Sequence, residues 1–284
     1  MNPQNRPAAR TDPLGAPWPG LIPLRPLAIG DLFSGALRLV RRRAGVLCAV
    51  AFAGALLGAG AQIAISLSFP ADQRTLPDNW AESAMAGSMT IPAGVLWPTV
   101  VGTLIEAFTG LVVTGLAAAF AAADVLDDTR PAQAALQRLR GRWPALLAVG
   151  LVVTVATVGG LFLFIVPGAV ALAMLTFATA VVPVERAGVG AALGRSVALS
   201  QGFRWRILGV ALLTLVIGTL ISSIALTPLP VNDTLTNLVL SLLLSSLVSA
   251  VVTPWTAGVL ALLYIDTRIR KENLATSLIR ATMR

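Results

Sequence analysis

The chain has 284 residues, of which 56% are hydrophobic and 12% are charged. Soluble globular domains carry roughly 25% charged residues, so this composition, with a mean hydropathy of +0.82, excludes a soluble domain and predicts an integral membrane protein. The absence of histidine and the single cysteine, Cys48, exclude a Ser-His-Asp triad, a histidine-containing zinc site and an internal disulfide.

Residues 1–26 contain seven of the 18 prolines and no apolar run. Proline holds the preceding backbone away from helix, and a segment with few apolar side chains cannot form a core. We therefore expect a disordered, proline-rich cytoplasmic tail over 1–26, which ends in an extended strap over 21–27. The missing apolar run also argues against a signal peptide.

Apolar stretches of spanning length follow the tail. A bilayer requires about 20 consecutive apolar residues. Residues 144–184 are 41 residues without a charge, so we expect a hairpin that turns at Val166-Pro167-Gly168. The membrane domain is expected over 27–275, and a cytoplasmic tail over 276–284. The predicted spans are 44–69, 93–123, 144–165, 168–184, 207–227 and 238–265.

The charged residues divide unequally between the two sides of this arrangement. With the amino terminus inside, the segments 1–43, 124–143, 185–206 and 266–284 hold 20 of the 21 Lys and Arg residues, and Arg74 is the exception. Basic residues collect on the cytoplasmic side of membrane proteins. We therefore expect both termini in the cytoplasm. The net charge of +8 is then a topological signal, and nucleic acid is not an expected partner.

Each predicted hairpin is preceded by apolar residues at helical spacing opposite polar ones, in 29–40, 132–139 and 189–197. Such patterns predict amphipathic helices that lie at the membrane interface. The predicted fold is therefore an all-α integral membrane protein. It has six transmembrane helices as three hairpins, each preceded by an amphipathic interfacial helix.

A basic edge, here called the basic collar, follows each of these amphipathic segments. Arginine and tryptophan suit the headgroup layer, where arginine contacts lipid phosphates. The collars either anchor and orient the bundle, form a lipid-headgroup site, or dock a cytoplasmic partner. Their arginines are Arg41, Arg42, Arg43, Arg140, Arg142, Arg204 and Arg206.

Glu106 interrupts the second apolar stretch, about 12 Å deeper than Trp97-Pro98 at 1.5 Å per residue. An acid near mid-bilayer is a functional candidate by default. We expect its polar face to turn inward as one seam, which contains Gly102, Glu106, Gly110, Thr114 and Ala118. A stripe on the last span offers Ser241, Ser245, Ser249 and Thr253 as partners. The seam either joins helices or forms a polar path for a proton, an ion or a lipid headgroup.

A glycine pattern in the first span and a group of charged residues at the cytoplasmic edge each allow two interpretations. Gly54-Ala55-Leu56-Leu57-Gly58 is a GxxxG pattern that allows close helix packing, within the bundle or in a dimer. Five residues near the cytoplasmic edge are expected to form ion pairs that fix helix ends, or else a switch or partner site. They are Glu185, Arg195, Asp266, Arg268 and Arg270. The 13 acids are scattered, so we expect neither a metal site nor a cofactor.

Several segments in the same order resemble a known family. They are Pro23-Leu24-Arg25-Pro26-Leu27 with Gly30-Asp31, the Val166-Pro167-Gly168 turn, Glu185 with Ala192-Leu193-Gly194-Arg195-Ser196, the residues Leu199, Gly202 and Trp205, and the run 263–272. Over residues 21–275 the chain resembles the membrane domain of the glycerophosphoryl diester phosphodiesterase family, which also occurs as a stand-alone bacterial membrane protein. The resemblance brings no catalysis, because in that family the chemistry belongs to a separate barrel with essential histidines.

These observations lead to one expected function and one alternative. We expect a non-enzymatic accessory or scaffold protein of the bacterial plasma membrane, which acts in membrane-lipid or envelope homeostasis. Its expected partners are anionic lipids on the cytoplasmic face and a membrane or cytoplasmic protein. The alternative is a small transporter or flippase-like protein that uses the polar seam around Glu106. An intramembrane enzyme is disfavoured, because the residues offer no cluster of nucleophile, base and electrophile.

Overall fold

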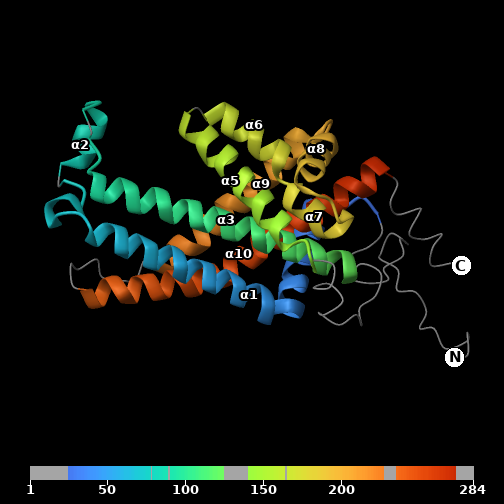
Figure 1. Ribbon diagram of the computed structural model, residues 1–284, viewed down its shortest axis with the longest axis horizontal. Coiled ribbons are helices and arrows are strands. Elements are labelled where there is room, and N and C mark those ends of the chain that lie inside the picture. The colour runs from blue at the N-terminus through green and yellow to red at the C-terminus, as the bar shows by residue number, and fades with distance from the viewer. Residues whose placement is uncertain are drawn as a thin grey trace, which may run out of the picture.

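The computed structural model describes residues 25–77, 79–88, 90–124, 140–163, 165–226 and 235–272, and this part of the chain is helical without a strand (Figure 1). In chain order its elements are α1 (Ile29–Leu67), η2 (Ala71–Gln73), α2 (Trp80–Met85), α3 (Ala93–Asp124), α5 (Trp143–Leu163), α6 (Ile165–Leu175), α7 (Ala178–Glu185), α8 (Val189–Ser200), α9 (Arg204–Leu226) and α10 (Leu235–Glu272). Six stretches of this part are long and apolar enough to cross a membrane, which confirms the predicted six-helix class.

Three long helices, α1, α3 and α10, pack on one another along their lengths. The shorter helices α5 to α9 lie against one half of this group, near the end where α1 begins and α10 finishes (Figure 1). The loop with α2 lies at the opposite end. The core is densest in the second half of α3, where the side chains from Val112 to Ala121 are all buried. This segment is rich in alanine, which allows neighbouring helices to approach closely.

The predicted amphipathic helix before the first span is continuous with that span. The two parts meet at a kink, where Arg43 has non-helical backbone angles (φ −118°, ψ 22°). The apolar face of the first part is buried against protein, because Leu32, Ala36 and Leu39 are fully covered. A Cβ on Gly258 of α10 would lie 3.2 Å from the Ala36 Cβ atom. Their apolar contact is thus with α10, and an interfacial position stays a prediction.

The other two predicted amphipathic helices have different outcomes. The segment 132–139 lies outside the described residues. The third is the separate helix α8, whose residues Ala192, Ser196 and Leu199 are buried. The Ser196 hydroxyl donates a hydrogen bond of 2.7 Å to the Met174 carbonyl oxygen. Met174 lies just before the break between α6 and α7, so α8 satisfies a carbonyl near the end of α6.

The predicted turn at Val166-Pro167-Gly168 is misplaced. Helix α5 ends at Leu163 and α6 begins at Ile165, so all three residues belong to the first turn of α6. Proline fits there because the first four N–H groups of a helix have no intrahelical partner. The break between the two helices lies between Leu163 and Ile165, and the predicted fourth span consists of two helices, α6 and α7.

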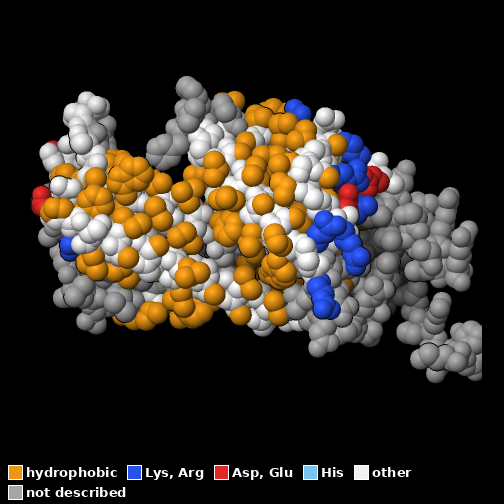
Figure 2. Space-filling model, viewed as in Figure 1, with side chains coloured by type: hydrophobic (Ala, Val, Ile, Leu, Met, Phe, Trp, Pro, Cys, Tyr) orange, Lys and Arg blue, Asp and Glu red, His pale blue; other side chains and the backbone are white. Residues whose placement is uncertain are grey.

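The charged residues follow the predicted asymmetry between the two ends. Figure 2 shows Lys and Arg side chains gathered toward the end where α10 finishes, and hydrophobic side chains over the middle of the molecule. Arg74 belongs to the opposite end, where it donates hydrogen bonds to carbonyl oxygens at the end of α1, including Phe69 at 2.9 Å. We call the arginine-rich end the basic end. Its cytoplasmic orientation stays a prediction.

Candidate functional site

A small polar pocket lies between α1, α3 and α10. Its volume is about 30 Å³, and it is lined by Ala55, Ala59, Gln62, Glu106, Ser245, Ser246 and Ser249. A cavity requires about 10–15 Å³ to hold one water molecule, so this pocket has room for one or two. The structure thus brings Glu106 together with Ser245 and Ser249 of the predicted stripe. We call this feature the Glu106 pocket.

Close packing of α1 on α3 forms the walls of the Glu106 pocket. A Cβ on Gly54 would overlap the Thr109 side chain, and a Cβ on Gly102 would overlap the Gln62 side chain. At Gly58 a Cβ would meet Ile105 Cγ2 at 3.5 Å. The GxxxG pattern therefore packs within the same chain. The glycines bring the two backbones together, and Gln62 crosses the space above Gly102.

The rest of the predicted seam lies outside the Glu106 pocket. Thr114 is buried, and its hydroxyl donates to the Gly110 carbonyl oxygen at 2.7 Å within α3. Ser241 and Thr253 do not line the pocket. The expectation that the whole seam turns inward is wrong for Glu106, whose side chain is exposed at the pocket edge.

Sequence reasoning missed two lining residues, Gln62 and Ser246. Gln62 was detectable as a lone amide in an apolar stretch, a costly placement unless the amide has partners. Ser246 is only 1% exposed, but it falls outside the spacing of four that defined the stripe.

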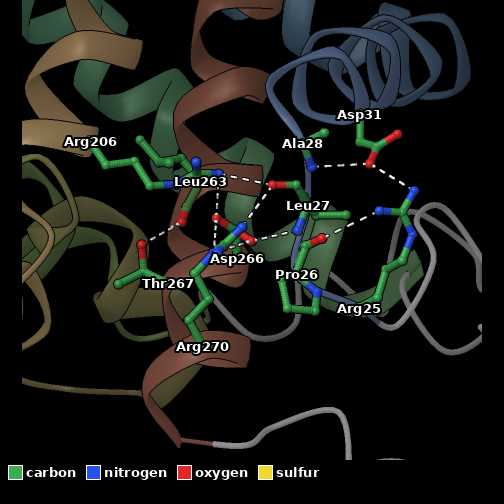
Figure 3. A network of polar contacts seen from close by, with 10 residues as sticks. All are labelled: Arg25, Pro26, Leu27, Ala28, Asp31, Arg206, Leu263, Asp266, Thr267 and Arg270. Atoms are coloured by element: carbon green, nitrogen blue, oxygen red, sulfur yellow. Dashed lines mark hydrogen bonds and ion pairs between the residues drawn. The ribbon is translucent and has the colours of Figure 1, made fainter.

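At the basic end, Asp266 holds the start of the described chain against α9 and α10 (Figure 3). The Asp266 side chain is fully buried and accepts a hydrogen bond of 2.7 Å from the backbone N–H of Leu27. It also accepts from Arg206 at 2.9 Å and from Arg270 at 3.0 Å to both carboxylate oxygens. One carboxylate is thereby shared by two guanidinium groups and one backbone amide. We call these four residues the strap network.

The strap network also satisfies the other backbone group of Leu27. The Leu27 carbonyl oxygen accepts one hydrogen bond from Arg206 and one from Arg270, both 2.9 Å long. Asp31 closes the start of α1, because its carboxylate accepts from the Ala28 N–H at 3.1 Å and pairs with Arg25 at 3.2 Å. Leu27 is buried between exposed neighbours, and both of its backbone polar groups are paired, as burial requires.

A second cluster joins α7, α8 and α10 around Glu185. Arg195 pairs with this carboxylate at 2.9 Å and also with Glu272. The Tyr264 hydroxyl donates to Glu185 at 2.9 Å, and Arg268 pairs with Glu272 at 2.9 Å. Burial alone lowers the pKa of Arg195, but its hydrogen bonds and charge interactions with the two glutamates outweigh burial and raise that pKa. Arg195 is therefore charged at any physiological pH. We call this the Glu185 cluster.

The five residues predicted to form ion pairs thus divide between two networks. Asp266 and Arg270 belong to the strap network, and the remaining three belong to the Glu185 cluster. Tyr264 and Glu272 complete the second network. Both stand in the run 263–272, and their spacing of four from Arg268 is the local signal for them.

The basic collar also divides into two groups. Arg43 forms a two-point ion pair with the fully buried Asp124, at 2.6 Å and 3.1 Å, and its guanidinium lies 5.5 Å from the centre of the Phe120 ring. Arg206 belongs to the strap network. These two arginines hold helices together. The other five collar arginines are exposed, as are Trp143 and Trp205, the latter by 86%. They are Arg41, Arg42, Arg140, Arg142 and Arg204.

The turns that precede two spans place these exposed groups. Gly141 (φ 75°) and Gly202 (φ 85°) have left-handed backbone angles, which glycine adopts without strain. Each turn leads directly into a helix that begins with tryptophan or arginine, α5 and α9.

In the part of the chain that the structure describes, no three His, Cys, Asp or Glu residues group together as metal ligands. Comparison of the chain with protein-family models, with curated proteins and with solved structures finds no match.

Proposed function

We propose that this protein is a non-enzymatic accessory or scaffold protein of the bacterial plasma membrane, and that its basic end binds anionic lipids on the cytoplasmic face. The proposal follows the resemblance to the membrane domain of glycerophosphoryl diester phosphodiesterases. A lipid-bound scaffold would hold or recruit a further protein in lipid or envelope homeostasis.

The observation that carries the proposal is the division of the arginines at the basic end. Arg43 and Arg206 bind buried carboxylates, so their charges are compensated inside the protein. Arg41, Arg140, Arg142 and Arg204 are exposed, and the last two stand next to exposed tryptophans. Arginine beside tryptophan at the end of an apolar helix is typical of the headgroup layer. The buried ion pairs fix the positions of the helix ends, and the exposed arginines are attached to helices held in this way.

Each basic residue near an anionic membrane surface contributes about 1 kcal/mol to binding. Four together would contribute about 4 kcal/mol and would therefore raise the affinity for anionic lipid by about 700-fold. The contribution is electrostatic, so it decreases as salt concentration rises.

The test replaces the four exposed arginines together, as R41Q/R140Q/R142Q/R204Q. Full-length proteins are extracted gently, and the phosphatidylglycerol that remains bound is counted by native mass spectrometry. We expect the quadruple variant to lose most of this lipid at an unchanged melting temperature. The matched control is R186Q, which removes one exposed arginine outside the collars. Equal retention by the wild type and the quadruple variant would refute the lipid site.

A second candidate function is transport through the Glu106 pocket. It is favoured by an acid and several hydroxyl groups from different helices that meet within apolar segments. The pocket volume of about 30 Å³ suits a proton or an ion and not a lipid headgroup. Proton and cation flux into proteoliposomes tests this candidate. Equal flux through the wild type and the E106Q variant would refute transport through the Glu106 pocket.

A further inference from the structure

We infer that the Glu106 pocket binds one small monovalent cation, Na⁺. This inference goes beyond the proposed lipid binding and does not depend on it. It rests on the residues that line the pocket, on their charge, and on the size and rigidity of the space.

The lining offers oxygen ligands from three helices. Glu106 contributes a carboxylate from α3, Gln62 an amide oxygen from α1, and the three serines contribute hydroxyl oxygens from α10. Carboxylate, amide and hydroxyl oxygens are the ligands of hard cations. A purely hydrophobic contact between helices would need none of these groups, and each is costly to place in an apolar span.

The charge of the lining selects the valence of the ion. Glu106 is the only charged residue that lines the pocket, and the lining contains no lysine or arginine. A monovalent cation neutralises one carboxylate, whereas a divalent cation would leave a net positive charge among apolar helices. A single monovalent cation would therefore balance the charge that the Glu106 carboxylate carries when it binds the ion.

The size of the pocket limits the ligand. Its volume of about 30 Å³ holds one ion or one to two water molecules, and it is too small for the ammonium headgroup of a lipid. The walls are fixed by close packing, because Gly54 and Gly102 admit the Thr109 and Gln62 side chains against the backbone. A rigid, small space of oxygen ligands favours Na⁺ over the larger K⁺.

Glu106 and Ser246 lie at different depths in the pocket. The Glu106 side chain is exposed at the edge, while Ser246 is 1% exposed and lies deeper. Along α3 the carboxylate is about 13 Å from the exposed Trp97, at 1.5 Å per residue. The carboxylate therefore stands at the rim of the pocket, and the inner serine hydroxyl groups lie behind it.

The test measures binding of radioactive ²²Na⁺ to the full-length protein in lipid nanodiscs. We expect one Na⁺ per chain, displaced by unlabelled Na⁺ and not by an equal concentration of K⁺. Sodium should also raise the melting temperature relative to choline chloride at equal ionic strength. For sodium at 100 times its dissociation constant the rise should be about 7 °C.

Two variants and one control separate the site from general salt effects. E106Q keeps the shape of the side chain and removes its charge, so it should abolish both ²²Na⁺ binding and the sodium-dependent rise. S249A should weaken binding several-fold. S241A is the matched control, because Ser241 is on the same helix and does not line the pocket, and it should bind as the wild type does.

Three results would overturn the inference. The first is a wild-type protein that binds no ²²Na⁺. The second is an equal melting temperature in sodium, potassium and choline salts, with pH dependence alone, which would indicate a protonated Glu106. The third is ²²Na⁺ binding that E106Q leaves unchanged. The wild-type measurements decide the matter even if a variant fails to fold. None of these results bears on lipid retention at the basic end.

Discussion

Replacing Asp266 of α10 by asparagine should destabilise the protein more than the same change at Asp31, the other carboxylate that holds the start of the described chain. The Asp266 side chain is fully buried, and it holds two guanidinium groups and the Leu27 amide. In the D266N variant the amide oxygen still accepts from Leu27, but Arg206 and Arg270 face each other without a counter-charge. Both positive charges then lack a counter-charge at a place where the Asp266 side chain was fully buried.

The magnitude follows from burial. Removing one partner of a buried ion pair costs about 3–5 kcal/mol. Arg206 and Arg270 are 28% and 27% exposed, so water screens part of their charge, and the lower value applies. A loss of about 3 kcal/mol corresponds to a decrease of about 8 °C in the melting temperature. The matched control is D31N, whose parent carboxylate pairs with Arg25 but is 29% exposed. An exposed pair contributes about 0–1 kcal/mol, so D31N should lower the melting temperature by about 2 °C.

The assay is thermal unfolding in detergent, followed by the fluorescence of the six tryptophans. A third variant, D266N/R270Q, should recover part of the loss, because it removes one of the two uncompensated cations. If D266N and D31N lower the melting temperature equally, the buried carboxylate does not hold the strap and the reasoning fails. A double variant that is less stable than D266N would refute the electrostatic explanation.

Three further predictions address packing, the buried pair and orientation. G54A should lower the stability by about 1–3 kcal/mol, and with it the melting temperature, because the new Cβ overlaps the Thr109 side chain. G60A is the control, because a Cβ there meets no atom within 4 Å and should leave the melting temperature unchanged. Equal effects of the two variants would contradict the close packing of α1 on α3. D124L should lower stability by about 3 kcal/mol because it removes the buried carboxylate that compensates the Arg43 guanidinium. R43M/D124L should recover most of this loss in the same unfolding assay, and no recovery would contradict the electrostatic explanation. The orientation can be tested with single cysteines in a C48S background, which removes the native thiol. T75C, near Arg74, should react with an impermeant maleimide in intact cells, and G188C, at the basic end, should react only after permeabilisation. The reverse pattern would show that the basic end faces outward.

The fold class was predictable because its signals are local. Uncharged stretches of spanning length and clustered arginines are properties of single segments, and hydropathy identifies them without knowledge of neighbours. Periodicity also identified Glu106, Ser245 and Ser249 as faces of two helices. Periodicity could not show that Gln62 of α1 lies beside Glu106 and the serines, because a local pattern does not tell which third helix packs against two others.

The ion-pair partners were predictable only in part. Arg43 and Asp124 are 81 residues apart, and Leu27 and Asp266 are 239 residues apart. From the sequence, Arg43 is indistinguishable from its neighbours in the collar, and only the kink in α1 directs it toward α3. The turn at Val166-Pro167-Gly168 illustrates a different limit. Proline and glycine are typical both of turns and of the first turn of a helix, so the sequence alone could not place the reversal.

The bond between Leu27 and Asp266 sets an order of events during synthesis. These residues belong to the first and last parts of the described bundle, and they are joined across 239 positions. At 5–20 residues per second, the ribosome needs roughly 10 to 50 s to reach Asp266 after Leu27 has been made. Throughout that interval Leu27 has no carboxylate to receive its amide. A nascent chain that stops before α10 therefore lacks Asp266, and its Leu27 amide is without the carboxylate that holds it in the complete bundle.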